Sequence, residues 1–350
     1  MVSLPDKKYP IYIQKGLIQN IGSEIKKIYA NKKIVIITDL NVDSLYGDKI
    51  ENSLKEEKFV VKKVIIEPGE KSKSFEILQD VCEDILEFGL GRGDLIIAFG
   101  GGVVGDLGGF AASILLRGIA FIQIPTTLLA QIDSSVGGKV AINSRSGKNL
   151  IGSFYQPDAV FIDPELLNSL SERVFNDGMA EVIKCAAIRD EKLFHKLLEY
   201  DSLEMLMNNI EELIFTCCEI KKSVVQVDEK DVGERMLLNF GHTIGHAIEK
   251  MFNYETFTHG EGVAMGMIAI TKNSEMLGIT ESGTLKLLIK LINKYNLPSE
   301  LPNMDEEEFY KALLLDKKNI NEGMNLILLK KIGCGFIKKI NLNDINKYVG

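Results

Sequence analysis

The sequence has few cysteines, no long apolar run and no excess of basic residues, and each shortage excludes a class of protein. Its five cysteines are an odd number and none are spaced C-x-x-C, which argues against a disulfide framework or a thiolate zinc site. No apolar run approaches the ~20 residues that cross a bilayer, and residues 1–13 lack the apolar region of a signal peptide. A net charge of -8 without a basic cluster argues against nucleic acid as a partner. We therefore expect a reduced, soluble, cytoplasmic protein with no membrane partner.

The 350 residues are enough for two domains, and the 45% of hydrophobic residues can fill a large core. Strand-like and helical segments alternate in the first half, which predicts a mostly parallel sheet with helices on both faces. The predicted strands are residues 9–14, 33–38, 60–66, 95–98, 121–124 and 159–162, and the predicted helices between them are 16–29, 75–88 and 103–116. Beyond residue 168 the apolar residues recur every three or four positions and β-rich runs nearly vanish, which predicts a second, helical domain.

A glycine-rich stretch follows the predicted strand 95–98 and leads into an apolar helix. Gly100, Gly102 and Gly105 satisfy the pattern G-x-G-x-x-G. Glycine lets the backbone approach a pyrophosphate, and the start of a helix favours an anion. The pattern alone is weak, and no acidic residue lies ~20 positions further on, where a dinucleotide fingerprint usually has one. The stretch favours nucleotide binding, with a close contact between helix and sheet as the alternative.

Two other segments of the first half carry polar groups in useful places. Asp39 follows a predicted strand, where it can hold a ribose hydroxyl or cap the next helix. Residues 133–149 contain Lys139 and Lys148, several glycines and little periodic structure, so we predict a long loop. Long loops inside compact domains are usually functional, and lysines suit an anionic ligand. A solvated loop is the alternative.

Three of the four histidines, His242, His246 and His259, fall within 18 residues. Because imidazole is the commonest ligand of zinc-like ions, this clustering favours a metal site over structural histidines. His242 and His246 are four apart on a predicted helix, so spacing alone would pair them as ligands. Spacing does not say which histidine binds metal and which binds substrate. Glu181, on another predicted helix, is either a further ligand or the partner of Lys184 in an internal ion pair.

Seven segments, taken together, resemble the 3-dehydroquinate synthase family. They are FGGGVVGDLGGFAA, RGIAFIQIPTTLLAQIDSSVGGKVAIN, GKNLIGSFYQP, GMAEVIK, LNFGHTIGHAIE, HGEGVAMGM and DKKN. The resemblance implies a Rossmann-like NAD-binding α/β domain in residues 1–168, an all-α metal- and substrate-binding domain in residues 169–350, and an active site in the cleft between them. It also implies the reaction that makes 3-dehydroquinate and phosphate from 3-deoxy-D-arabino-heptulosonate 7-phosphate in the shikimate pathway. That reaction runs by transient oxidation with tightly bound NAD, phosphate elimination, re-reduction and intramolecular aldol closure.

The resemblance also implies roles for individual residues. One divalent ion, zinc or cobalt, would be held by Glu181, His242 and His259, and His246 would face the substrate. The positions that resemble catalytic and substrate-binding residues are Asp133, Lys139, Lys148, Asn149, Lys184, Arg235, Asn239, His246 and Lys317. The positions that resemble the NAD site are Asp39, Asn41, Glu70, Lys73, Gly102, Gly105, Asp106, Thr126 and Thr127, together with Lys139 and Lys148. Arg117 resembles an arginine that reaches the active site of the partner subunit, which implies a homodimer.

Two other activities fit much of the same pattern. One is a sugar-phosphate cyclase that makes an inosose or valiolone, and the other is a metal-dependent polyol dehydrogenase. The cyclase relatives tend to change the residues that read the substrate acid, whereas Asn239, His246 and Lys317 are all present here. A dehydrogenase would release its NADH and would not need the lysine-rich segment 133–149. Dehydroquinate synthesis is therefore the favoured hypothesis.

Overall fold

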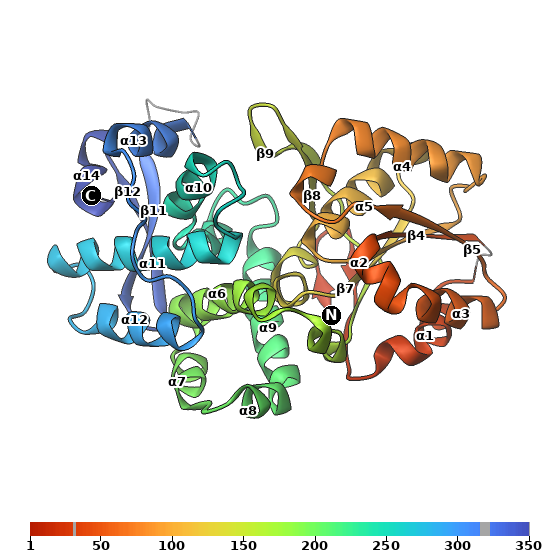
Figure 1. Ribbon diagram of the computed structural model, residues 1–350, viewed down its shortest axis with the longest axis horizontal. Helices are drawn as coiled ribbons and strands as arrows, with labels where there is room; N and C mark the ends of the chain where they lie inside the picture. The colour runs from red at the N-terminus through yellow and green to blue at the C-terminus, as the bar shows by residue number, and fades with distance from the viewer. Residues whose placement is uncertain (31–32, 316–322, 350) are drawn as a thin grey trace. The chain divides into compact units, whose positions relative to one another are not determined.

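The computed structural model describes residues 1–30, 33–315 and 323–349. The chain divides into two compact units, Met1–Leu170 and Ser171–Gly350 (Figure 1). Lys317 and the DKKN segment lie outside the described residues, so their predicted role stays a prediction. No described helix is both long enough and apolar enough to span a membrane.

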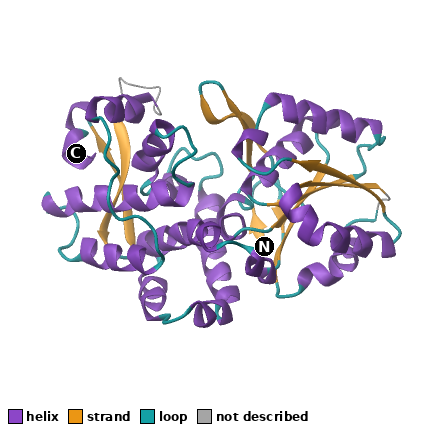
Figure 2. Cartoon of the chain, viewed as in Figure 1, coloured by secondary structure: helices purple, strands orange, loops and turns teal. Residues whose placement is uncertain are grey.

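A six-stranded parallel sheet forms the centre of the first unit, as the sequence predicts (Figure 2). Its strands run in the order β3 (Ile11–Ile13), β10 (Ala159–Ile162), β7 (Ala120–Pro125), β6 (Leu95–Gly100), β4 (Lys33–Asp39) and β5 (Val60–Ile66). Central strands such as β4 and β6 are apolar along nearly their whole length because both faces of the sheet are covered.

Helices pack on both faces of this sheet. Ile34 and Ile36 of β4 point to the face covered by α1 (Ile21–Ile28) and α3 (Asp48–Glu56), while the alternate residues Val35 and Ile37 point to α4 (Phe75–Glu87) and α5 (Gly102–Ile114). One crossover runs from β4 to β5, and the next returns past β4 to β6. The sheet therefore has its topological switch point between β4 and β6, where open α/β sheets bind ligands.

Shorter elements complete the first unit. They are β1 (Val2–Ser3), β2 (Lys8–Tyr9), η1 (Leu17–Asn20), α2 (Leu40–Val42), η2 (Asp43–Gly47), η3 (Glu70–Ser72), η4 (Leu115–Arg117), η5 (Ala130–Ser134), β8 (Lys139–Ser144), β9 (Gly147–Phe154) and η6 (Pro164–Ser169). The predicted single strand 9–14 is divided at Pro10, which has no backbone N–H for a sheet.

The prediction of a long loop over residues 133–149 was wrong for most of its length. After η5, strands β8 and β9 form an antiparallel hairpin in which Ile142 pairs with Ile151. Val140 and Ile142 are buried in the core beneath α5. The apolar part of β8 is only three residues long and lies among lysine, glycine and serine, so its alternation is too short to identify from the sequence.

The second unit is helical, as predicted, and also contains a β-hairpin that the sequence analysis missed. Its helices are α6 (Glu172–Arg189), α7 (Glu191–Glu199), α8 (Leu203–Asn208), α9 (Ile210–Val227), η7 (Glu234–Asn239), α10 (His242–Met251), α11 (His259–Met276), α12 (Thr284–Lys294), α13 (Glu306–Leu315), η8 (Leu342–Asp344) and α14 (Asn346–Val349). Strands β11 (Met324–Lys331) and β12 (Cys334–Ile340) pair antiparallel. The lysines and glycines in these strands hide their alternation.

Candidate active site

The switch point of the first unit brings together the two segments that were predicted to bind a nucleotide. Thr38 at the end of β4 pairs with Phe99 at the end of β6. Gly101 is the N-cap of α5, and no side chain among the described residues caps this helix. The N–H groups of its first turn therefore suit an anionic ligand.

The glycines of α5 also serve the packing role that was the alternative to nucleotide binding. A Cβ added at Gly105 would lie 2.7 Å from Oε1 of Gln123, and one at Gly108 would lie 3.1 Å from Cβ of Ala98. Helix α5 can therefore pack close to the sheet because these glycines have no side chains. Both interpretations of the glycine stretch are compatible with this geometry.

Asp39 caps α2, which was one of its two predicted roles. Its Oδ1 accepts hydrogen bonds from the backbone N of Asn41 at 2.9 Å and of Val42 at 3.1 Å. This places Asp39 and Asn41 together at the carboxyl end of β4. Any ribose contact of Asp39 stays a prediction.

Lys73 joins several predicted NAD-site residues to the hairpin. Its side chain is 3% exposed, and Nζ lies 2.6 Å from Oδ2 of Asp106 and 3.7 Å from Oε1 of Glu70. Nζ also donates to Oδ1 of Asn149 in β9, while Nδ2 of Asn143 donates to Glu70. Burial opposes the charge of Lys73, but the Asp106 and Glu70 carboxylates outweigh it and raise the pKa of the lysine. The amine therefore remains protonated and fixes these groups in one network.

The other predicted residues of the first unit lie just after β7 and in η4, η5 and the hairpin. Thr126 donates its backbone N–H to Gly100, and the hydroxyl of Thr127 accepts from the N–H of Ala130. Arg117 is exposed and has a positive φ of 70°. The remaining three are Asp133 in η5, Lys139 at the start of β8 and Lys148 in β9.

In the second unit, α10 and α11 pack backbone against backbone. A Cβ added at Gly266 would lie 2.0 Å from the carbonyl oxygen of Gly241, and one at Gly245 would lie 2.9 Å from the carbonyl carbon of Gly262. Since His242 and His259 are the first residues of these two helices, the close crossing brings their rings to 5.0 Å between centroids.

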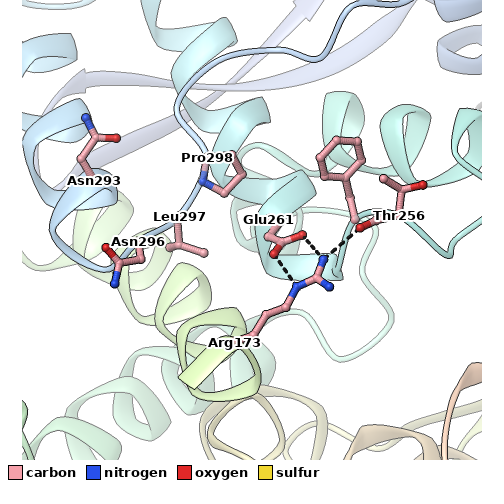
Figure 3. Close-up of a pocket in the computed structure, with 8 residues that line it drawn as sticks. Arg173, Thr256, Glu261, Asn293, Asn296, Leu297 and Pro298 are labelled. Carbon is pink, nitrogen blue, oxygen red and sulfur yellow. Dashed lines mark hydrogen bonds and ion pairs between the residues drawn. The ribbon is translucent and has the colours of Figure 1, made fainter. Parts of the chain in front are cut away.

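The start of α11 is fixed by a capping box and by a contact from α6. Thr258 accepts from the N–H of Glu261, and Glu261 in turn accepts from the N–H of Thr258. Arg173 of α6 binds both carboxylate oxygens of Glu261 at 2.8 Å beside an open surface pocket (Figure 3). Helix α11 is thus capped next to His259.

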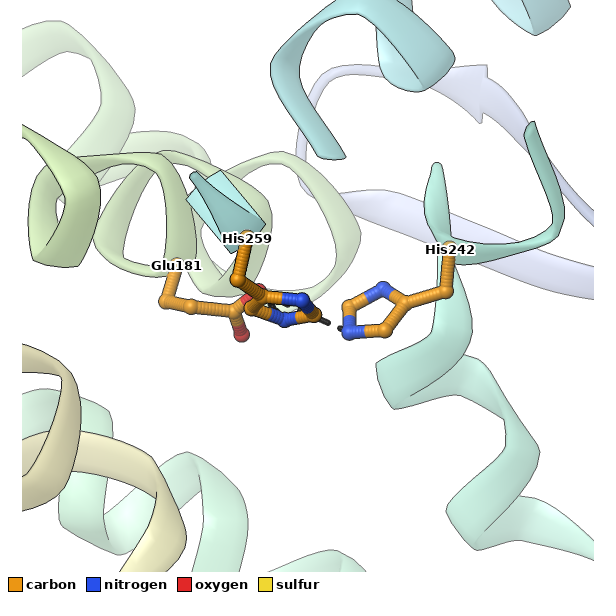
Figure 4. Close-up of side chains that lie close together, drawn as sticks. All are labelled: Glu181, His242 and His259. Atoms are coloured by element: carbon orange, nitrogen blue, oxygen red, sulfur yellow. Dashed lines mark ion pairs between the residues drawn. The ribbon is translucent and has the colours of Figure 1, made fainter. Parts of the chain in front are cut away.

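Glu181, His242 and His259 converge from α6, α10 and α11 (Figure 4). Oε1 of Glu181 lies 3.6 Å from Nε2 of each histidine, and the side chain of Glu181 is fully buried. Two ligands of a tetrahedral zinc ion, each about 2.1 Å from the metal, are about 3.4 Å apart. The three ligand atoms therefore have the chemistry and the spacing for one divalent ion.

Lys184 shows that the two predicted roles of Glu181 coexist. Its side chain is 1% exposed, and Nζ forms an ion pair with Oε2 of Glu181. The carboxylate thus uses one oxygen for the lysine and turns the other toward the histidines. An ionised carboxylate at this depth requires a cation, and Lys184 is one such partner.

Glu249 is a site residue that the sequence analysis missed. It is 2% exposed, and its Oε2 lies 3.2 Å from Nδ1 of His259. His259 therefore has a carboxylate at each ring nitrogen, and His246, Glu249 and His259 form a second group with metal-ligand spacing. The signal available in the sequence was that Glu249 lies three residues after His246, on the same face of α10.

The two histidines that face Glu181 differ in their electrostatics. Burial opposes the charge of His259, but its hydrogen bonds to Glu181 and Glu249 outweigh this and raise its pKa to about 10. Burial and the nearby ammonium of Lys184 lower the pKa of His242 well below its usual value. His242 is thus neutral at pH 7 and has a lone pair for a metal, whereas His259 must exchange a proton for it.

The structure places three other predicted residues in the second unit. Arg235 is buried, and its Nη1 donates to the carbonyl of Glu229 at 2.6 Å. Asn239 is half-buried at the end of η7. The ring of His246 lies 5.3 Å from that of His242, so these two share a face as their spacing predicts.

Comparisons with known proteins cover the chain almost from end to end. Residues 63–177 match the family model described as 3-dehydroquinate synthase N-terminal, and residues 178–319 match 3-dehydroquinate synthase C-terminal. The chain is 54% identical to a 3-dehydroquinate synthase of Clostridium acetobutylicum, over 99% of this chain and 98% of that one. It is 43% identical to one of Enterococcus faecalis, over 99% and 97%.

Solved structures of related cyclases share the architecture. A 2-deoxy-scyllo-inosose synthase complexed with carbaglucose-6-phosphate, NAD+ and Co2+ aligns with a TM-score of 0.87 at 25% identity, over 99% of this chain and 98% of that one. A 2-epi-5-epi-valiolone synthase of Streptomyces hygroscopicus with NAD+ and Zn2+ has a TM-score of 0.90 at 24% identity, over 99% and 97%, and shows the fold alone. The chain matches both family models and is 54% identical to a relative over nearly its full length. It therefore belongs to the 3-dehydroquinate synthase family.

Proposed function

We propose that this chain catalyses the conversion of 3-deoxy-D-arabino-heptulosonate 7-phosphate to 3-dehydroquinate and phosphate, with NAD and one divalent metal ion. The observation that carries the proposal is the cluster of Glu181, His242 and His259 in a chain that matches both halves of the family model. Cyclases of the same fold carry NAD+ with Co2+ or Zn2+, which supports these cofactors.

The second unit provides the metal side of the reaction. Glu181, His242 and His259 hold the ion, Lys184 keeps Glu181 ionised, and Glu249 orients the ring of His259. A divalent ion bound there would polarise a substrate hydroxyl and lower its pKa. His246, whose ring lies 5.3 Å from that of His242, would face the substrate.

The first unit provides the NAD side of the reaction. The switch point with Asp39, the first turn of α5 and the network of Lys73 is the proposed dinucleotide site. When bound there, NAD would supply the transient oxidation of the substrate and its reversal that the phosphate elimination requires. Lys139 and Lys148 of the first unit would supply positive charge of the kind that the substrate carboxylate and phosphate require.

The test is an assay of phosphate release from 3-deoxy-D-arabino-heptulosonate 7-phosphate, with NAD and zinc or cobalt, while absorbance reports NADH. We expect phosphate without net NADH, because the substrate is oxidised and reduced within one turnover. Accumulation of NADH with a polyol and no phosphate would replace this proposal with a dehydrogenase. Phosphate release from a hexose 6-phosphate alone would replace it with an inosose-type cyclase.

We further propose that the chain acts as a homodimer in the cytoplasm. Exposed Arg117 is accompanied by two exposed apolar side chains, Ile114 at 47% and Phe154 at 38%. Ile114 ends α5 and Phe154 ends β9, and the hydroxyls of the preceding Ser113 and Ser153 lie 2.9 Å apart, so the ends of these two elements are neighbours. All five cysteines are free thiols, which fits a reducing compartment.

A further inference from the structure

We propose that Arg173 and Asp177 are positioning residues that set the metal affinity of the site by holding His259 against Glu181. The inference rests on the proposed metal site and adds two residues that touch no metal ligand atom. Arg173, Asp177 and Glu181 are spaced four residues apart on α6 and so lie on one face of that helix. We call these three residues the α6 row.

Arg173, the first member of the α6 row, forms hydrogen bonds to the chain on both sides of His259. The guanidinium of Arg173 donates to both oxygens of Glu261 and, through Nη2, to the carbonyl of Thr256 at 2.9 Å (Figure 3). The bidentate contact is specific to the planar fork of arginine. It ties the residue three positions before His259 and the residue two positions after it to a single side chain.

The second member holds the residue next to His259. Oδ1 of Asp177 accepts a hydrogen bond from the backbone N of Gly260. A Cβ added at Gly260 would lie 2.2 Å from the carbonyl oxygen of Asp177, so the two backbones are in direct contact. At this point the start of α11 cannot move closer to α6, and the Asp177 carboxylate prevents it from moving away.

The third member is the proposed ligand itself. With the backbone of α11 held at the residue next to His259, Nε2 of His259 lies 3.6 Å from Oε1 of Glu181. Glu249 fixes the ring from the opposite nitrogen at 3.2 Å. The backbone of His259 is thus set by α6 and its ring orientation by α10, so the distance between the two ligands depends on Arg173 and Asp177. Groups that orient metal ligands commonly affect affinity by about 10- to 100-fold.

The proposed positioning role can be distinguished from a role in fold stability alone. The side chain of Arg173 is 58% exposed, and exposed ion pairs add little to the free energy of unfolding. Loss of the α6 row contacts should therefore weaken metal binding by more than it destabilises the metal-free fold. The pair of Lys331 and Glu191, 2.9 Å apart in the same unit and about half exposed, offers a matched control.

The experiment uses the full chain with Arg173→Ala, Asp177→Ala, Asp177→Asn and the control Lys331→Ala. Zinc affinity is measured by competition with a chromophoric chelator, the ligand field by the visible spectrum of the Co2+ form, and the metal-free fold by its Tm. We expect the two alanine variants at 173 and 177 to bind zinc about 10-fold more weakly and to show shifted Co2+ bands. Asp177→Asn should restore both, because its amide oxygen still accepts from Gly260. Arg173→Ala and Asp177→Asn should match the control in metal-free Tm.

Unchanged zinc affinity and Co2+ bands in the alanine variants would overturn the proposal. A loss of affinity with unchanged Co2+ bands and a Tm well below the control would also overturn it, since that is general destabilisation. No substrate or NAD is present, so the result is separable from the proposed reaction. If the variants bind zinc more weakly but the wild-type protein releases no phosphate, the role of the α6 row stands and the proposed reaction is rejected. If the wild-type protein releases phosphate but the variants bind zinc normally, the reaction stands and the role of the α6 row is rejected.

Discussion

Asp228 shows what a single buried carboxylate contributes to the second unit. It follows α9, is 9% exposed, and accepts backbone hydrogen bonds from Val232 at 3.1 Å, Gly233 at 2.7 Å and Arg235 at 3.0 Å. Burial raises the pKa of this group, but the three N–H donors and the Arg235 charge outweigh it and lower the pKa below the ordinary value of 3.8. The segment that carries Arg235 is therefore shaped by one ionised side chain.

We predict that Asp228→Asn lowers the free energy of unfolding at pH 7 by about 1–3 kcal/mol, because an amide replaces one acceptor with a donor that faces an N–H group. The folded-state pKa of Asp228 is depressed, so its contribution is complete above the unfolded pKa of 3.8 and is lost as the pH falls through the folded-state value. Denaturant titrations should show a gap between wild type and variant that is constant from pH 7 to 5 and narrows below pH 4. A gap that widens in acid would contradict this role.

At the scale of residues, the sequence predicts ligand types better than ligand partners. The clustering of histidines predicted a metal site, but spacing alone paired His242 with His246, and His259 was named as a ligand only by the family resemblance. Neither spacing nor composition could show that Glu249 faces Nδ1 of His259. That contact depends on how α10 and α11 cross, and the sequence carries the crossing only as scattered glycines. The sequence also could not show how Glu181 serves two partners. One of its carboxylate oxygens pairs with Lys184 and the other faces the histidines.

At the scale of elements, the proposed metal site depends on the crossing of α10 and α11. The backbones of these two helices are in contact close to the proposed metal ligands. We predict that Gly266→Ala separates them, since its Cβ would lie 2.0 Å from the carbonyl oxygen of Gly241 and backbone cannot yield as a flexible side chain can. The cost should be about 1–3 kcal/mol of unfolding free energy, together with weaker zinc binding because His242 follows Gly241. Chemical denaturation and chelator competition measure the two effects.

The control for this prediction is Gly91→Ala. Its nearest neighbour would be Oδ2 of Asp94 at 3.4 Å, an ordinary contact with a side chain, and we expect both measurements to stay at wild-type values. If Gly266→Ala behaved like this control, the close crossing would not be what places the two histidines.

Elements also show where pattern analysis succeeds. The sheet was predicted because strands such as β4, with four consecutive apolar residues, alternate with amphipathic helices. Both hairpins, β8–β9 and β11–β12, were missed because lysine, glycine and serine interrupt the alternation that normally marks a strand. Their pairing is fixed by contacts with α5 and α6, which are distant in sequence.

At the scale of the whole molecule, the proposed homodimer gives a complementation prediction. If Arg117 acts in the partner's site and Lys148 acts in its own, Arg117→Ala and Lys148→Ala are each inactive alone. In a mixed dimer one site regains both residues and the other loses both. Random reassortment of equal amounts makes half of the dimers mixed, so we expect about a quarter of wild-type phosphate release.

The mixture must be unfolded and refolded together, or allowed to exchange subunits, and each variant treated alone is the control. Activity that stays at the level of the separate variants, in a sample shown by mass to contain mixed dimers, would place Arg117 in its own subunit's site. Full zinc binding by both variants is expected, since neither residue belongs to the metal cluster.

The burial of Lys73 and Lys184 also determines how the protein responds to acylating reagents. Their side chains are 3% and 1% exposed and carry ion pairs, whereas Lys139 at the start of β8 is exposed. An amine-reactive label read by peptide mass spectrometry should modify Lys139 within minutes and leave Lys73 and Lys184 untouched while the fold is intact. Labelling of Lys73 would then report that the hairpin has detached from α5. Labelling of Lys184 would separately report that the helical unit has opened.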